Sequence, residues 1–125
     1  MAKKKIQFIK NQTLDFSNNL EYACDEIKCG DMVFTMKSFK LQHGHNDSLP
    51  YYAILCCNKK PICECVNDGW GGTTSMAPLD KSFDAIKNGL DGYSWACGGM
   101  TIQLSLDFIA DILADKVFDK IYNQN

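Results

Sequence analysis

The sequence predicts a single α+β domain over residues 1–125, in which a small antiparallel sheet of three to four strands packs against two or three helices. Two patterns support this fold class. Residues 51–57 and 62–66 are short apolar runs on either side of a turn, as in a β-hairpin. Residues 105–121 repeat apolar side chains at helical spacing. A chain of 125 residues with 46% hydrophobic residues has the length and apolar content of one packed domain.

In the first half of the chain we expect a short strand, a helix and a long strand. Residues 6–10 alternate weakly and indicate a first strand. Ser17 suits the N-cap of a helix, and Gly30 stands where that helix would end. The apolar positions of this helix would be Leu20, Ala23, Cys24 and Ile27. Residues 32–41 alternate as a long strand, and residues 42–50 form a polar, turn-rich loop.

The hairpin of residues 51–66 is the clearest element of the chain. If residues 58–61 form its loop, Cys56 pairs with Cys63. One face of the hairpin then carries Cys56, Cys63 and Cys65, and because both faces are largely apolar we expect helices to cover at least one of them.

Glycine-rich stretches and two further helices follow the hairpin. Residues 67–77 form a loop rich in glycine and hydroxyl groups. Pro78 opens a helix that ends near residues 88–89. Residues 91–100 are a second glycine-rich stretch, and Ser105 caps the last helix.

The charged residues disfavour nucleic acid as the main ligand. All 13 basic residues are lysine, and 15 acidic residues leave a net charge of −2. Without arginine, the chain lacks the planar fork that binds phosphate and guanine in a bidentate manner. Four acidic residues recur every fourth position on the last helix: Asp107, Asp111, Asp115 and Asp119. We interpret them as a solvated outer face, in preference to mimicry of a phosphate backbone.

The seven cysteines favour a reducing compartment. An odd number would leave one thiol outside a closed disulfide framework. We recognise no secretory signal, and no apolar run approaches the length of a membrane span. We therefore expect a cytoplasmic protein that does not bind membranes, in which most cysteines serve as small core residues.

One segment resembles a known group of proteins. Residues 52–55, a lysine-rich turn, and then residues 66–72 (Val-Asn-Asp-Gly-Trp-Gly-Gly) resemble small, uncharacterised proteins of bacteriophages and mobile elements. In that group a β-hairpin runs into an Asn-Asp-Gly-x-Gly-Gly motif. This chain departs from the pattern at the turn, where Asn58 is followed by Lys59 instead of glycine. The resemblance implies a phage or mobile-element protein that acts in the cytoplasm of a bacterial host, and it implies no activity.

The same motif supplies the candidate binding site. Its residues are Asn67, Asp68, Gly69, Trp70, Gly71, Gly72, Thr73, Thr74 and Ser75. Successive backbone N–H groups and the hydroxyl groups could cradle an anion such as a nucleotide phosphate, with Trp70 stacked on the base. An equally weighted interpretation is a structural turn, in which Trp70 packs on the sheet and Asp68 bonds local amides.

Two weaker sites involve histidine and cysteine. His43 and His45, together with Cys56, Cys63 and Cys65 on the hairpin, could be drawn as a zinc site. The spacing matches no zinc-knuckle pattern, so we expect core thiols and solvated histidines, with no metal or cofactor bound.

Taken together, these patterns favour a non-enzymatic binding protein that acts by occupying a host component, with counter-defence as its natural role. The alternative is sequestration of a small nucleotide signal by the glycine-rich loop. A second alternative is a metal-dependent or cysteine-dependent enzyme, for which Cys97 beside Gly98 and Gly99 is the best-placed nucleophile. The partner is then a host protein or a small nucleotide, and self-association stays open.

Overall fold

The computed structural model describes residues 5–15, 24–41, 50–67 and 74–122, the last four of these by backbone alone, and about half of the described residues lie in strands. The described residues form nine strands in two sheets and two helices. The predicted small sheet of three to four strands is therefore wrong, because the larger sheet has six strands and 52% of the described residues are in strands.

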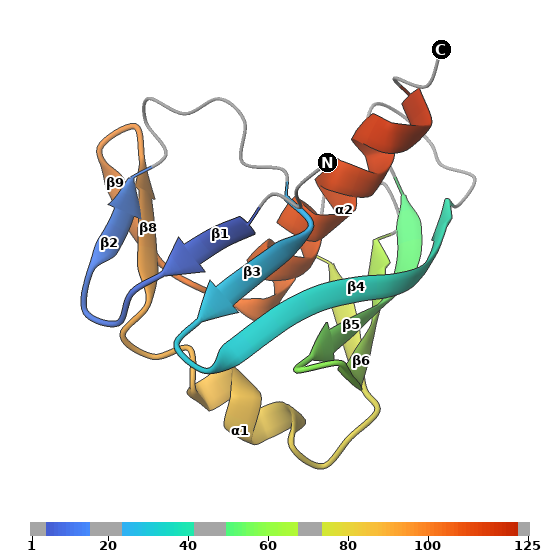
Figure 1. Cartoon of the computed structure of the whole chain (residues 1–125), viewed down its shortest axis with the longest axis horizontal. Coiled ribbons are helices and arrows are strands. Elements are labelled where there is room, and N and C mark those ends of the chain that lie inside the picture. Colours follow the sequence, from blue (N-terminus) through green and yellow to red (C-terminus); the bar gives the residue numbers. More distant parts are fainter. Residues whose placement is uncertain (1–4, 16–23, 42–49, 68–73, 123–125) are drawn as a thin grey trace.

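The larger sheet has the order β1-β3-β4-β5-β6-β7 and curves around one long helix (Figure 1). Strands β1 and β3 pair in parallel, and all other neighbours pair in antiparallel fashion. The strands span β1 (Lys5–Phe8), β3 (Glu26–Cys29), β4 (Met32–Leu41), β5 (Tyr51–Cys57), β6 (Lys60–Asn67) and β7 (Ser75–Pro78).

The smaller sheet has the order β2 (Thr13–Asp15), β8 (Ser94–Cys97) and β9 (Met100–Gln103). An apolar row crosses one face, where Leu14 lies beside Trp95 and Trp95 beside Ile102. Trp95 stacks on Phe108 of the last helix with ring centroids 4.2 Å apart. This contact attaches the small sheet to the core.

Helix α2 (Leu106–Tyr122) packs against β3 and β4 and fills the concave side of the larger sheet (Figure 1). Ser105 caps it, since the Phe108 N–H donates to the Ser105 hydroxyl at 3.4 Å. Of the apolar positions predicted for this helix, Leu106, Ile109, Ile112 and Leu113 are buried and Val117 is half-buried, and the buried set also includes Ala110, Ala114 and Phe118. Helix α1 (Phe83–Asn88) is a single short helix with no fully buried residue.

The two expected helices in the first and middle parts of the chain differ from the structure: the described end of the first is a strand, and the second begins later than predicted. Ile27 and Cys29 are fully buried at a spacing of two in β3, so residues 26–29 are not helical; residues 17–23 lie outside the described part. Gly30 adopts a φ of +60° in the tight turn between β3 and β4, instead of ending a helix. Pro78 ends β7, and α1 begins five residues later at Phe83.

The hairpin of β5 and β6 exists, but its register differs from the prediction. Its turn contains only Asn58 and Lys59, both with positive φ, so Cys57 pairs with Lys60. A β-bulge then shifts the register, and Leu55 lies opposite Cys63. This brings Cys63 onto the core-facing side of the hairpin, which the predicted four-residue loop does not do.

Candidate functional site

The Asn67–Ser75 segment connects two neighbouring strands. Asn67 is the last residue of β6, and Ser75 is the first residue of β7 and lies opposite Val66. Residues 68–73, including Trp70 and all three glycines of the motif, lie outside the described residues. The structure therefore fixes where the loop leaves and rejoins the sheet. The loop ends before residue 77, where the prediction placed its end, because residues 75–78 form β7.

Four polar side chains meet at the base of this loop, and we call them the Asp111 cluster: Tyr51, Asn67, Thr74 and Asp111. The Thr74 hydroxyl donates to Asp111 Oδ1 at 2.6 Å, and the Tyr51 hydroxyl donates to the same oxygen at 3.1 Å. Asn67 Nδ2 donates to Thr74 Oγ1 at 3.3 Å. The cluster thus links β5, both ends of the loop and α2.

Burial sets the electrostatics of the cluster. Thr74 is 5% exposed and is the single buried polar residue in the described part of the chain. Desolvation raises the pKa of the Asp111 carboxyl, although the hydrogen bonds from Thr74 and Tyr51 oppose the shift. Desolvation also raises the pKa of the Tyr51 phenol, so this side chain stays a neutral donor. Hydrogen bonds to a partly buried carboxylate are among the stronger ones in proteins, so the cluster holds the loop ends firmly.

Sequence reasoning placed Asn67 and Thr74 in the site but missed Tyr51 and Asp111. Asp111 was expected on a solvated face, whereas it is half-buried and accepts two hydrogen bonds. Its immediate neighbours Ala110 and Ile112 are both core residues. An acidic residue between two core positions is the signal that could have indicated a buried partner.

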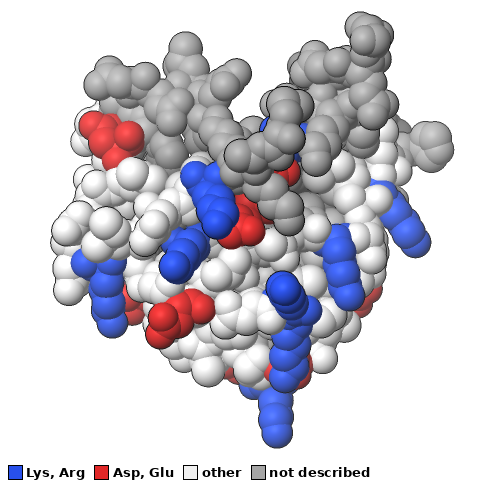
Figure 2. Space-filling model, viewed as in Figure 1, with Lys and Arg blue, Asp and Glu red and all other residues white. Residues whose placement is uncertain are grey.

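The outward face of the sheet next to the loop carries a mixed set of exposed and half-buried side chains. The Tyr52 hydroxyl donates to the Glu64 carboxylate, and Lys40 Nζ lies 5.7 Å from the centre of the Tyr52 ring. Val66, the neighbour of Asn67, is 43% exposed. On the face viewed in Figure 2, lysines and acidic residues alternate without forming a patch of one sign.

The zinc site drawn from the sequence is not assembled by the described residues. Cys63 and Cys65 face the core with their sulfur atoms 3.9 Å apart, but the strand alternation puts Cys56 on the opposite face of the hairpin. The predicted common face for these three cysteines is therefore wrong. His43 and His45 lie outside the described residues, and within the described ranges no three His, Cys, Asp or Glu side chains could hold a metal ion.

Six of the seven thiols are buried, and Cys97 is exposed at the end of β8. Burial, with a smaller effect of Cys57, raises the pKa of Cys29 to about 12. Burial also raises the pKa values of Cys56 and Cys57. These thiols stay protonated at neutral pH, which suits core residues and opposes a nucleophilic role.

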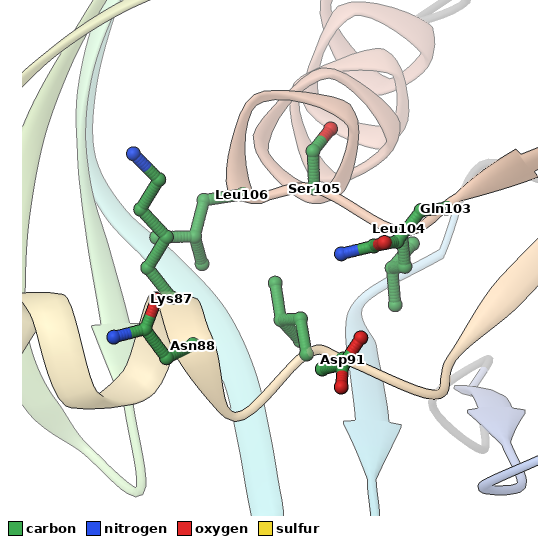
Figure 3. A pocket seen from close by; sticks show the side chains of 8 residues that line it. Lys87, Asn88, Asp91, Gln103, Leu104, Ser105 and Leu106 are labelled. Atoms are coloured by element: carbon green, nitrogen blue, oxygen red, sulfur yellow. The ribbon is translucent and has the colours of Figure 1, made fainter.

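A shallow pocket of about 420 Å³ lies between the end of α1 and the start of α2 (Figure 3). Its lining comprises Lys87, Asn88, Leu90, Asp91, Gln103, Leu104, Ser105 and Leu106. One lysine and one aspartate contribute opposite charges, and the remaining residues are neutral. The Ser105 hydroxyl is engaged in capping α2. Neither the sequence pattern nor the lining points to a particular ligand here.

Comparisons of the chain with protein-family models, with curated proteins and with solved structures give no match. Neither described helix is long and apolar enough to cross a membrane.

Proposed function

We propose that this protein is a binding protein whose recognition element is the Asn67–Ser75 loop, and that it acts by occupying a surface of a partner protein. The observation that carries this proposal is the Asp111 cluster, which fixes both ends of the loop to the sheet and to α2. A loop whose ends are held by a rigid scaffold loses less conformational entropy when it binds. Loops of this kind commonly carry binding residues.

The charges around the loop base favour a protein partner over a nucleotide. The ionisable groups of the cluster are the Asp111 carboxyl and the neutral Tyr51 phenol, and neither attracts a phosphate. Residues 66–125 contain eight aspartates and four lysines, so this half of the chain is acidic. The exposed Val66 and the half-buried Tyr52 beside the loop add apolar and aromatic contact area of the kind that protein interfaces use.

The resemblance of residues 51–72 to phage and mobile-element proteins supports a partner in a bacterial host. In that setting a small protein that blocks a host component by occupancy would serve as a counter-defence factor. Such a protein needs an accessible recognition surface and no catalytic group, which agrees with the loop-centred site proposed here.

Quantitative affinity capture from bacterial lysate tests this proposal with three forms of the protein. The wild type and an Ile9→Ala control should enrich the same protein, since Ile9 is exposed and remote in sequence from the loop. Trp70→Ala should lose that protein while it keeps the wild-type melting temperature. The interaction is then rebuilt from the two purified components.

Equal capture by the wild type and Trp70→Ala would contradict the proposal. A thermal-shift panel of mono-, di- and cyclic nucleotides forms the second arm. A rise in melting temperature that Trp70→Ala abolishes would replace the protein partner with a nucleotide.

A further inference from the structure

Strand β9 (Met100–Gln103) is a short, exposed sheet edge that carries no charged residue, no proline and no bulge. It pairs with β8 on one side, and no described strand pairs with its other side. All four of its residues are exposed, with Met100 at 64% and Ile102 at 39%. Natural proteins normally protect such edges with lysine, proline, a bulge or a very short strand. The sequence Met-Thr-Ile-Gln contains neither lysine nor proline, and its pairing with β8 is regular.

The lack of charge around this edge suits a second copy of the chain. Residues 92–106 contain no charged side chain, although 22% of the whole chain is charged. Each copy carries a net charge of −2, so two copies repel each other weakly overall. At an uncharged edge two identical chains can approach without charge repulsion. The same edge offers no opposite charge to a strongly charged peptide.

The hairpin geometry determines which backbone groups of β9 are free. Gly98 and Gly99 form a two-residue turn with φ of +60° and +83°, so Cys97 and Met100 form the hydrogen-bonded pair that closes it. Hydrogen-bonded and non-hydrogen-bonded pairs then alternate along the hairpin. The bond from Leu104 N–H to Tyr93 C=O at 2.9 Å agrees with this alternation. Met100 and Ile102 therefore bond to β8, whereas Thr101 and Gln103 point their backbone N–H and C=O groups outward.

We propose that β9 pairs with β9 of a second copy of the chain, in antiparallel fashion about a two-fold axis at Ile102. In this register Thr101 lies opposite Gln103 of the other copy, and each such pair exchanges two backbone hydrogen bonds. The two copies of Ile102 face each other as a non-hydrogen-bonded pair, in which side chains lie closest. The two small sheets become one continuous sheet of six strands.

The register also joins the apolar rows of the two copies. Leu14, Trp95 and Ile102 form one row across the small sheet. Pairing about Ile102 continues this row into the second copy and covers the exposed part of Ile102. Because a four-residue edge buries less area than a stable interface of about 1,200–2,000 Å², the dimer is expected to be weak, with a dissociation constant in the micromolar range or above.

Sedimentation velocity over a wide concentration range tests the proposal. The wild type should shift from monomer to dimer as its concentration rises. Ile102→Lys places two like charges opposite each other and should weaken dimerisation by about tenfold or more. Ile9→Lys introduces the same charge at a residue that is 52% exposed outside β9, and it should change dimerisation less than about twofold. Circular dichroism confirms that each variant is folded.

A disulfide test checks the register and does not depend on Ile102→Lys folding. In a Cys97→Ser background, Ile102→Cys should form a cross-linked dimer under air, because the two Cα atoms lie about 4.5 Å apart in this register. Thr101→Cys in the same background should cross-link poorly, because its two Cα atoms lie about 9 Å apart by strand rise and spacing.

A wild type that stays monomeric at every concentration would overturn the proposal. So would a dimer that Ile102→Lys leaves intact, or cross-linking that favours Thr101→Cys over Ile102→Cys.

Discussion

Asp111→Ala is the substitution that tests the Asp111 cluster most directly. It removes the carboxylate that accepts hydrogen bonds from Thr74 and Tyr51. Both donors are buried, with Thr74 at 5% and Tyr51 at 2% exposure, so neither can turn to water. They still lie 3.3 Å from each other, which lets one hydroxyl donate to the other. One of the two hydrogen-bond donors then has no acceptor within the cluster.

The expected cost follows from this count. A buried donor that loses its partner costs about 1–3 kcal/mol, and the lost hydrogen bond to a charged group falls in the same range. The burial that raises the pKa of Asp111 makes its charged form less favourable, so part of that cost is recovered when the carboxylate is removed. We expect Asp111→Ala to lower the free energy of unfolding by about 2 kcal/mol at neutral pH.

Urea unfolding measures this change, with Asp115→Ala as the matched control. Asp115 lies one turn further along α2 and is exposed, so the change in helix propensity is the same in both variants. Because Asp115 is exposed and solvent screens its interactions, the control should lose less than about 1 kcal/mol relative to the wild type. If Asp111→Ala and Asp115→Ala unfold at the same urea concentration, the cluster does not stabilise the loop base and the argument above is wrong.

Asp111→Asn separates the charge from the hydrogen bonds. Asparagine keeps an acceptor oxygen for Thr74 and removes the buried charge, so this variant should lie within about 1 kcal/mol of the wild type at pH 7. The folded pKa of Asp111 lies above its ordinary value of 3.8. At pH values between the unfolded pKa and the higher folded pKa, the folded state binds more protons than the unfolded state. The free energy of unfolding therefore falls as the pH rises from the unfolded pKa to the folded pKa. Asp111→Asn lacks this loss and should gain stability relative to the wild type from about pH 4 upward. A constant difference at all pH values would contradict the raised pKa.

Three further predictions concern turns, thiols and metal. Gly30→Ala should destabilise the protein more than Gly98→Ala in urea unfolding. Both glycines have a φ of +60°, which costs alanine about 1 kcal/mol. Only at Gly30 would the new methyl group also meet a neighbour, the Tyr93 hydroxyl oxygen at 2.5 Å. Equal losses would show that Tyr93 moves aside freely. With a chromogenic disulfide reagent, one thiol should react quickly in the folded wild type, and no thiol should react quickly in Cys97→Ser, because the other six cysteines are buried. Several fast-reacting thiols would contradict the described core. Elemental analysis of the purified protein should find zinc well below one equivalent per chain, and stoichiometric zinc would restore the histidine–cysteine site.

The sequence was sufficient to predict the elements in which one pattern dominates. Residues 32–41 alternate over most of their length and form β4 with the predicted bounds, although an irregularity between Lys37 and Lys40, with Ser38 at a φ of +56°, interrupts the pairing with β5. The last helix was also predicted correctly, because its apolar residues recur over more than three turns and Ser105 caps it. Such long periodic segments leave little choice between helix and strand.

The remaining elements depended on information that a local pattern does not contain. Ile27 fits both helical spacing and the alternation of β3, and the pairing of β3 with β1 and β4 decides between them. Cys63 faces the core because of the β-bulge in the hairpin and the two-residue turn at Asn58 and Lys59. This turn was not predicted, because neither residue is the glycine that is typical of two-residue turns. For the site, the ends Asn67 and Thr74 were predicted, whereas Asp111 was missed because its partners are at least 37 residues away in the sequence.

The pairing of β2 with β8 has a consequence for how the chain is synthesised. Thr13 lies opposite Ser94, so β2 has no partner strand until the ribosome has added about eighty further residues. The larger sheet can form in sequence order as β3 to β7 emerge, but its concave face is covered only when Leu106–Phe118 follows. A nascent chain that stalls before residue 94 therefore exposes both an unpaired strand and the apolar side of a sheet. Such a chain is a substrate for chaperones and proteases, and these strands become fully protected only after α2 has been made.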